Sequence, residues 1–598
     1  MKLLTSKELA RAANLDIPGG VVIAKALMQI FRYNKLNRVY TNTYDSDPAI
    51  FINSILDHLD IRYDIPENDL ENIPLTGPFI TVSNHPFGGI DALILLKILA
   101  RRRSDVRVMA NFLLQKIDPL KHLIVPADAE GERYQGKVSL KGMEEAMNHV
   151  REGHGLALFP AGEVSAYHSE SGLITDMEWQ EQILREIKMA EVPVIPVYFH
   201  GTNSRWYHIL GRIHPLLSTA KLGSELFNKR HKVIRVRIGR SLSVSEQAGF
   251  GDIARFGRYL RARTYSLGSS LEAKPFFAGL ARRRNKRQEP VAPPSDRATL
   301  AAEISNIRRT HELFAIGNFV VLFAPTRAIP NLIREIGRMR EVTFRAVGEG
   351  TNRATDLDEY DFYYHHLVIW DEAAGVLVGA YRVGKGREII SQYGIKGFYI
   401  NSLFRIRKSF EPVLAESLEL GRSFIVQEYQ KKAMPLFLLW KGLLTVLLQN
   451  AGYRFLIGPV SISNEFSAFS KSLIVEFVRS NYFDREMARY IRPRKKFTPQ
   501  IDRRIDSEII ISSAERDINK VEKVVSDVDK GYRIPVLLKK YLEVNARIIG
   551  FNVDPDFNNC LDGLIMLDIH NLPAGFVSSL SKDQNEAEVA RRLRRRDS

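Results

Sequence analysis

Residues 81–96, TVSNHPFGGIDALILL, place a histidine and an aspartate close together between two apolar runs. The run before His85 is β-branched and the run after Asp91 is leucine-rich, so we expect a strand followed by a helix. Gly88 and Gly89 can adopt positive φ angles and allow a tight connection. A carboxylate beside an imidazole raises its basicity, as a general base for a hydroxyl requires. The alternative is a polar turn in which Asp91 caps a helix.

Three further segments carry polar or small residues where a predicted strand ends. They contain Arg133 in ADAEGERYQGK, Pro160, Gly162, Glu163 and Ser165 in LFPAGEVS, and His200 with Gly201 in VPVIPVYFHG. Ligands of parallel sheets bind at the carboxyl ends of the strands. We therefore expect these loops to form one cleft with His85.

Over roughly residues 50–245, these segments resemble the glycerolipid acyltransferase family of the lysophosphatidic acid acyltransferase type. The matches are Asn84, His85 and Asp91 to its Asn-His and Asp block, Arg133 more loosely to its arginine loop, Phe159, Pro160 and Gly162 to its Phe-Pro-Glu-Gly-Thr block, and VIPV at 194–197 to its Ile-Pro-Val block. The resemblance implies that His85 is the general base, that Asp91 orients it, and that the acceptor hydroxyl attacks an acyl thioester. It also implies substrate binding by Asn84, Arg133, Pro160, Gly162 and Glu163.

Two departures from that family concern the acceptor. Five residues, PFGGI, separate His85 from Asp91 where the family usually has four, and Ala161 and Glu163 replace its acid and threonine. That region of the family helps to hold a phosphate-bearing acceptor, so glycerol 3-phosphate is not the expected substrate. The HPFGGI form resembles the hemolysin-like branch that is linked to aminolipids.

The second half of the chain contains another cluster of reactive side chains. DLDEYDFYYHHLVIWD groups Asp356, Asp358, Asp361 and Asp371 around two histidines, and GAYRVGKG follows. A glycine-containing loop with nearby basic residues can hold a pyrophosphate or a phosphopantetheine arm through backbone N–H groups. The alternative for the acids is a solvated loop.

This half resembles the GNAT-like N-acyltransferase superfamily, in the ornithine lipid synthase branch related to acyl-homoserine lactone synthases. The matching residues are Asp358, Asp361, Arg382, Glu419 and Arg422. The resemblance implies an acyl chain taken from acyl carrier protein, Glu419 as the base or substrate anchor, and substrate recognition by the other four. The late block PVLLKKYLEVNARIIGFNVDPDFNNCLDGLIMLDI also resembles hemolysin-like members of this group.

The elements that must position these residues alternate between β-rich and helical patterns. We predict an α/β fold with a largely parallel sheet in the first half and a mixed α/β, GNAT-like domain in the second. A basic, Pro-rich seam divides them. The predicted organisation is a helical region at 1–50, an O-acyltransferase domain at 51–280, a linker at 281–300 and an N-acyltransferase domain at 301–598. Each half carries its own set of predicted site residues, so the halves should be separable.

Composition limits the partners. The chain has 598 residues and one cysteine. Its formal net charge of +16 favours an acidic partner. AMPLFLLWKGLLTVLLQNAGY is interrupted by Lys441, so it predicts a buried or interfacial helix rather than a membrane span. The start of the chain lacks the pattern of a signal peptide. We expect no metal and no bound cofactor, and the single cysteine excludes a cysteine-rich zinc site. We also expect no nucleic acid, because no stacking platform of aromatic and basic residues surrounds the predicted clefts.

These observations predict a bifunctional aminolipid synthase, specifically an ornithine lipid synthase, peripheral to the cytoplasmic face of the bacterial inner membrane. The second half would N-acylate the amino acid with a 3-hydroxyacyl chain from acyl carrier protein, and the first would O-acylate that hydroxyl with an acyl chain from acyl carrier protein or CoA. Alternatives are glycine, lysine or another amine as the acceptor, a lysophospholipid acyltransferase with an accessory domain, a basic membrane- or nucleic-acid-binding protein, and a lytic hemolysin.

Overall fold

The structure is a computed structural model that describes residues 5–7, 10, 18–31, 33–110, 112–115, 117–127, 139–213, 215–271, 288–555 and 557–580. They form two compact units. The first comprises Met1–Ala273, Ile501–Glu515 and Asn519–Lys530, and the second comprises Lys274–Gln500, Arg516–Ile518 and Gly531–Ser598.

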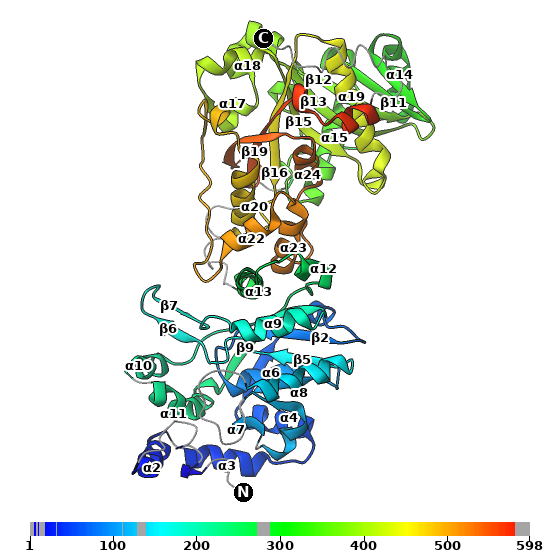
Figure 1. Cartoon of the computed structure of the whole chain (residues 1–598). Coiled ribbons are helices and arrows are strands. Elements are labelled where there is room, and N and C mark those ends of the chain that lie inside the picture. Colours follow the sequence, from blue (N-terminus) through cyan, green and yellow to red (C-terminus); the bar gives the residue numbers. More distant parts are fainter. Residues whose placement is uncertain are drawn as a thin grey trace. The chain divides into compact units, whose positions relative to one another are not determined.

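The first unit is built on a seven-stranded sheet with the order β1-β9-β8-β2-β5-β3-β4 (Figure 1). Its strands are β1 (Ile61–Asp64), β2 (Phe79–Ser83), β3 (Arg107–Ala110), β4 (Ile124–Pro126), β5 (Gly155–Leu158), β8 (Val194–His200) and β9 (Lys232–Ile238). All neighbours run parallel except β8 and β9. The largely parallel sheet that the sequence predicts is confirmed.

Helices cover both faces of this sheet. The helices α4 (Pro48–His58) and α6 (Gly89–Ala100) share one apolar core with the strands. On the other face lie α9 (Glu181–Met189) and α13 (Ile253–Ser266) (Figure 1). The helix α6 is apolar nearly all round and its residues are mostly buried, as is typical of a helix between a sheet and a second layer.

The expected helical start of the chain is present in its described part, as α2 (Gly20–Ile30) and α3 (Tyr33–Thr43). The helices α10 (Arg205–Ile213) and α11 (Pro215–Glu225) follow β8, and α11 contacts α3. A short hairpin, β6 (Ala166–His168) and β7 (Leu173–Thr175), contacts α10.

A late segment of the chain completes the first unit. The helix α22 (Ser507–Ala514) and most of α23 (Ile518–Val528) belong to it, and α22 packs on α13. Asp527 is buried and its Oδ2 lies 2.5 Å from Nη2 of the buried Arg263. The predicted second domain, 301–598, contains this returning segment, so the compact units are not two consecutive halves of the sequence.

The second unit is built on an eight-stranded sheet with the order β10-β11-β12-β13-β15-β16-β19-β18. The strands are β10 (Glu312–Ile316), β11 (Phe319–Pro325), β12 (His365–Asp371), β13 (Val376–Lys385), β15 (Ser417–Ile425), β16 (Phe455–Ile462), β18 (Arg547–Asp554) and β19 (Cys560–Asp568). The predicted turn at 372–375 joins β12 to β13 as expected. Two helices, α14 (Arg297–His311) and α15 (Leu332–Ala346), cover one face of the sheet.

The parallel neighbours β15 and β16 diverge within this sheet. They pair only from Ser417 to Glu419, opposite Phe455 to Ile457, while the other neighbours run antiparallel. Just beyond the paired residues, β15 bulges at Arg422, whose φ is 51°. A bulge and a short ladder leave a gap between two strands in the middle of the sheet.

Two predictions on individual segments can also be compared with the structure. The apolar segment that contains Lys441 forms α19 (Ala433–Gln449), which is largely buried against β11 and β12. Within the described residues, no helix is both long and apolar enough to cross a bilayer. Of the predicted linker at 281–300, residues 281–287 lie outside the described part, and α14 already begins at Arg297.

Candidate active sites

His85 lies in the turn between β2 and α6. Its Nδ1 is 3.0 Å from Oδ2 of Asp91, which is completely buried, while the histidine side chain is 16% exposed. Burial raises the pKa of the Asp91 carboxyl, an effect opposed by its contact with His85. The imidazole therefore contacts a buried acid through Nδ1, while part of its ring stays exposed.

The same carboxylate oxygen also caps the helix. The backbone N–H groups of Phe87 and Gly88 donate to Asp91 Oδ2 at 2.9 and 3.1 Å. Gly88 has a φ of 87°, whereas Gly89 is the first residue of α6. Asp91 thus makes the contacts of both alternatives, because one carboxylate at the helix start can face the turn and the imidazole together, and its role in catalysis stays a prediction.

Asp176, which the sequence interpretation missed, holds His85 and the loop after β5 together. Its Oδ1 accepts from the His85 backbone N–H at 3.1 Å and from the Ser165 hydroxyl at 2.6 Å. Ser165 in turn donates its N–H to the His85 carbonyl at 2.9 Å, and the Phe159 ring lies 4.2 Å from the imidazole. The predicted convergence of these two loops is confirmed.

The loop after β8 also reaches this site. Asn84 exchanges two hydrogen bonds with the backbone of Phe199, at 2.9 and 2.7 Å, which fixes the ends of β2 and β8 side by side. The following residue, His200, is partly buried. Asn84 is therefore occupied by the scaffold, and its predicted contact with substrate stays a prediction.

The other predicted residues of the first site occupy different surroundings. Pro160 is buried, Gly162 has a φ of 71°, and Glu163 is exposed. Arg133 lies outside the described residues. Substrate binding by these four residues stays a prediction.

In the second unit, the predicted acids and arginines form a buried ion-pair network. Arg382 Nη1 is 2.5 Å from Asp358 Oδ1 and 3.3 Å from Asp361 Oδ2. Asp361 also pairs with Arg340 at 2.8 Å. These pairs hold the pKa of Asp361 well below its usual range despite its burial. The structure thus brings Asp358, Asp361 and Arg382 together in one group of ion pairs.

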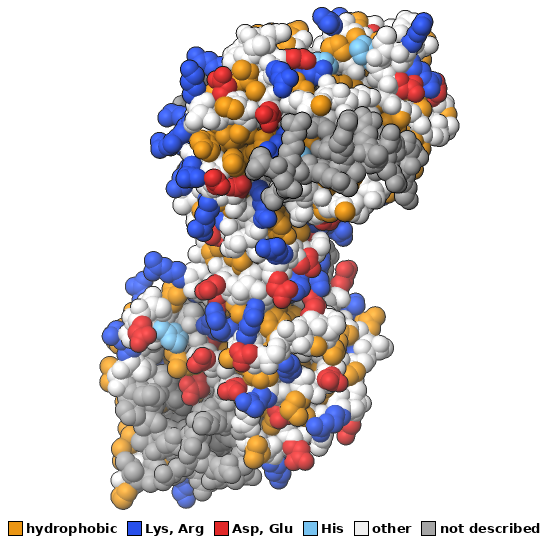
Figure 2. Space-filling view, turned by 45° about the horizontal axis from the view of Figure 1, so that its top comes forward, with side chains coloured by type: hydrophobic (Ala, Val, Ile, Leu, Met, Phe, Trp, Pro, Cys, Tyr) orange, Lys and Arg blue, Asp and Glu red, His pale blue; other side chains and the backbone are white. Residues whose placement is uncertain are grey.

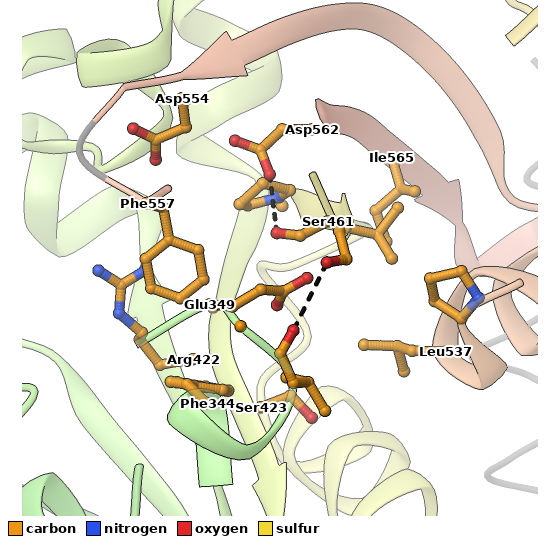
Figure 3. A pocket seen from close by; sticks show the side chains of 18 of the residues that line it. Phe344, Glu349, Arg422, Ser423, Ser461, Leu537, Asp554, Phe557, Asp562 and Ile565 are labelled. Atoms are coloured by element: carbon orange, nitrogen blue, oxygen red, sulfur yellow. Dashed lines mark hydrogen bonds between the residues drawn. The ribbon is translucent and has the colours of Figure 1, made fainter. Parts of the chain in front are cut away.

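Arg422 extends this network to a cavity. Its Nε lies 3.1 Å from Asp356 Oδ2, and its Nη1 donates to the Tyr399 hydroxyl at 3.2 Å. The bulge in β15 directs the guanidinium away from the ladder, and it contacts the ring of Phe557 (Figure 3). Of the predicted residues in this half, Arg422 lies in the cavity wall.

Glu419 is buried behind that wall. It accepts hydrogen bonds from the N–H groups of Tyr399 and Ile400, at 3.1 and 2.7 Å, and from the Tyr364 hydroxyl. Burial raises the pKa of Glu419 to about 7. Tyr399 lines the cavity and Glu419 does not, so Glu419 reaches the cavity only through the residue that it anchors.

The cavity has a volume of about 650 Å³ and opens where β15 and β16 diverge. Four acids line it: Glu349 after α15, Glu465 after β16, Asp554 at the end of β18, and Asp562 on β19. Figure 3 shows Glu349, Asp554 and Asp562 around the cavity. Burial raises the pKa of Glu349 and of Asp562 to about 7, and for Asp562 the neighbouring acids add to the effect. Ser461 donates to Asp562 Oδ1 at 2.7 Å.

The sequence interpretation did not identify these four acids. Asp554 and Asp562 belong to the late block, to which the family resemblance assigns no role. Their positions after and within β-rich runs could have placed them on a sheet, but only the pairing of β19 with β16 brings them to the gap.

Among the described residues, one group of side chains has the composition of a metal site. His149, Glu152 and His154 each place a ligand atom within 4.8 Å of the others. Both histidines already form hydrogen bonds with Asp105, at 3.0 Å each: His149 with its backbone carbonyl and His154 with its carboxylate. The group lies at the turn after α8 (Leu140–Arg151) and contributes nothing to either site described above.

Comparison with known proteins finds similarity in two segments of the chain. Residues 6–274 match the family described as acyltransferase, and residues 339–440 match the acetyltransferase (GNAT) domain. The glycine N(alpha)-acyltransferase of Bacteroides thetaiotaomicron is 29% identical over 301 residues, which cover 48% of this chain and 87% of that protein.

Two further relatives concern O-acyl transfer. The lyso-glycine lipid O-acyltransferase of the same organism is 27% identical over 252 residues, or 41% of this chain and 89% of that protein. The crystal structure of the 1-acyl-sn-glycerophosphate (LPA) acyltransferase PlsC from Thermotoga maritima covers 42% of this chain and 92% of that chain, at 17% identity and a TM-score of 0.25. The chain is an acyltransferase that joins an O-acyltransferase domain to an N-acyltransferase domain of the GNAT type.

Proposed function

We propose that this protein makes a di-acylated amino-acid lipid in two steps. The second unit N-acylates an amino acid with a 3-hydroxyacyl chain, and the first unit O-acylates the new hydroxyl. The observation that carries the proposal is a separate site in each unit: a His85–Asp91 pair in one, and an acid-lined cavity at a gap in a GNAT sheet in the other. Relatives named for glycine N-acylation and lyso-glycine lipid O-acylation support the same pairing of steps.

In the first step, the amine must lose a proton to attack the thioester carbonyl. A carboxyl group with a pKa near 7 can accept that proton at neutral pH. Asp562 and Glu349 have such pKa values and line the cavity. The C–N bond forms as the C–S bond breaks, and the thiol leaves with a proton. We assign Glu419 the role of anchoring Tyr399 beside this reaction.

The acceptor in this proposal is a diamino acid such as ornithine. Four carboxyl groups and the guanidinium groups of Arg422 and Arg533 line the cavity, so its acids outnumber its bases, just as the two amino groups of ornithine outnumber its one carboxylate. This balance of charges supports a second amine in the substrate. The competing acceptor is glycine, which the names of the relatives support.

In the second step, His85 takes the proton of the 3-hydroxyl group. The oxygen attacks a second acyl thioester, and the C–S bond breaks to release the thiol. Asp91 stabilises the imidazolium that forms, because its buried carboxylate lies 3.0 Å from Nδ1. Asp176 and Ser165 hold the backbone of His85 while this occurs.

An acidic acyl carrier protein is the proposed donor for the first step. Lys and Arg side chains gather along one edge of the second unit (Figure 2), and the chain has a net charge of +16. Complementary charge speeds the encounter between such partners. CoA as the thiol is the alternative, and a purified N-acylation assay with each donor distinguishes them.

The product would place the enzyme at a membrane surface, and we propose that it is peripheral to the cytoplasmic face of a bacterial inner membrane. The basic charge supports this location. Pelleting with membranes at low salt and release at high salt are expected. An enzyme that stays in the supernatant at low salt contradicts the location.

The test of function is lipid extraction from cells that express the chain, followed by mass spectrometry. A new di-acylated lipid with an ornithine headgroup is expected, together with smaller amounts of its mono-acylated precursor. A glycine headgroup would assign the acceptor to glycine and leave the two steps intact. An unchanged lipid profile, with folded protein present, would overturn the proposal.

A further inference from the structure

The outward face of α10 has an unusual composition for a helix surface. Trp206, Ile209 and Ile213 are 68%, 44% and 68% exposed, and they follow one another at positions i, i+3 and i+7. Arg205 and Arg212 are exposed beside them. The inward residues Tyr207 and His208 are buried, so the helix is anchored in the first unit and still presents its large apolar side chains to the outside.

A face of this kind has the properties of an interfacial helix. Adjacent large apolar residues are uncommon on the surface of soluble domains and indicate a contact site. Tryptophan favours the boundary between headgroups and acyl chains, and flanking arginines favour anionic headgroups. The apolar and cationic composition of the outward face therefore favours a lipid surface over a small ligand.

The position of α10 connects this face to the His85 site. The helix begins directly after the loop that follows β8, where Gly201 packs against the ring of Phe87 in the His85 turn. On its other side, Arg212 lies over the ring of Tyr167 in the β6–β7 hairpin, at 5.4 Å. That hairpin connects Ser165 and Asp176, the two residues that hold His85.

We propose that the outward face of α10 inserts into the headgroup region of an anionic phospholipid bilayer and holds the His85 site at the membrane surface. The acceptor and product of the second acylation then enter and leave without crossing water. Val22 and Ile30 on α2, in the same unit, are also exposed apolar residues. This inference rests on the proposed function, because a lipid acceptor is what makes the location useful.

Intrinsic fluorescence provides a direct test. The chain has four tryptophans, and the other three, Trp179, Trp370 and Trp440, are buried. Vesicles of phosphatidylglycerol and phosphatidylcholine, with bromine on the acyl chains, quench tryptophan that inserts. We expect quenching of the full-length protein by these vesicles and loss of most of it in Trp206→Phe. Binding to the vesicles without quenching of Trp206 would overturn the proposal.

Sedimentation with the same vesicles measures the contribution of the face to binding. The triple variant Trp206→Ser, Ile209→Ser, Ile213→Ser should bind at least about tenfold more weakly, because three apolar side chains no longer insert. Leu140→Ser is the matched control, since Leu140 is 80% exposed on α8 of the same unit. Unchanged binding of the triple variant would overturn the proposal and assign the face to another partner.

An activity measurement separates this inference from the proposed chemistry. The triple variant should O-acylate a lyso-aminolipid dissolved in detergent at the wild-type rate, and lose activity only on acceptor embedded in vesicles. If the wild type O-acylates the dissolved acceptor and yet does not bind vesicles, the inference on α10 fails and the proposed function stands. If it binds vesicles and never O-acylates, the proposed function fails instead.

Discussion

The buried Asp91 contacts the imidazole of His85 and also caps α6. Substitutions of Asp91 and His85 can separate these two contributions. His85→Ala removes only the proposed base, so O-acylation should fall about 100-fold or more and the mono-acylated lipid should accumulate. Lipid mass spectrometry measures both products. His231→Ala is the control, since this histidine also pairs with an aspartate, Asp60, but is exposed. Normal di-acylated lipid from His85→Ala would reduce the pair to a capped turn.

Asp91 itself should behave differently from His85. Asp91→Ala removes the acceptor of two backbone N–H groups at the start of α6 in addition to the partner of the imidazole. We expect it to lose O-acylation and also about 1 kcal/mol of stability, as for loss of a helix cap. Urea unfolding measures the second effect. Asp91→Asn should lose activity with a smaller change in stability, because its side-chain oxygen can still accept.

The identity of the proton acceptor in the second unit predicts a pH dependence. Asp562 has a pKa of about 7, and only its deprotonated form can accept a proton from the amine. The N-acylation rate should therefore rise as the pH rises through about 7 and level off above it. Asp562→Asn or Glu349→Gln, whichever removes the proton acceptor, should lower the rate and abolish this step, while Glu419→Gln keeps it. The opposite result would assign the base to Glu419, as the sequence alone suggests.

At the scale of elements, the gap between β15 and β16 depends on the close approach of their paired ends. A Cβ atom on Gly458 would lie 2.1 Å from the Leu420 carbonyl oxygen, with no flexible side chain to move aside. Gly458→Ala should therefore cost about 1–3 kcal/mol and impair N-acylation. Gly563→Ala on β19 is the control, because its nearest neighbours lie at 3.5 Å. Urea unfolding compares the two variants, and equal midpoints would contradict the prediction.

The sequence was informative about elements whose pattern is local. The turn at 372–375 and the strands around His85 follow from apolar runs and glycines, and they were predicted correctly. The strands β1 and β9 were not identified, since IRYD has only four residues and KVIRVRI carries three charges and no continuous apolar run. The acids of the cavity could not be found in this way, because Asp554 and Asp562 reach the gap through pairing of β19 with a strand about a hundred residues earlier.

At the scale of the whole molecule, the returning segment changes how the chain can be divided. A fragment 1–273 lacks α22 and α23 and leaves the buried Arg263 without Asp527. An unpaired buried charge costs about 3–5 kcal/mol, so this fragment should be poorly soluble on its own. Co-expression with a fragment 288–598 should restore soluble protein, and affinity purification of one fragment should recover the other.

Activity of the separate fragments tests the same point. The sequence predicts that a fragment from about residue 300 onward N-acylates alone, and the second unit does contain its complete cavity. Such a fragment exposes the apolar residues of α22 and α23 that are buried in the whole chain, including Ile509, Val521 and Val524. We expect N-acylation from it only in the presence of the first fragment or a solubilising partner. Full solubility and activity alone would show that the returning segment is dispensable.

The return of residues 501–530 to the first unit also has a consequence during translation. The ribosome synthesises the sheet of the first unit early, yet the helices that cover α13 emerge only after most of the second unit has been made. The sheet of the second unit is complete only after β18 and β19 have been synthesised, and these strands follow the returning segment. Neither unit can therefore reach its final fold on the nascent chain before about residue 530, and a premature stop codon near residue 500 should abolish both acylations together.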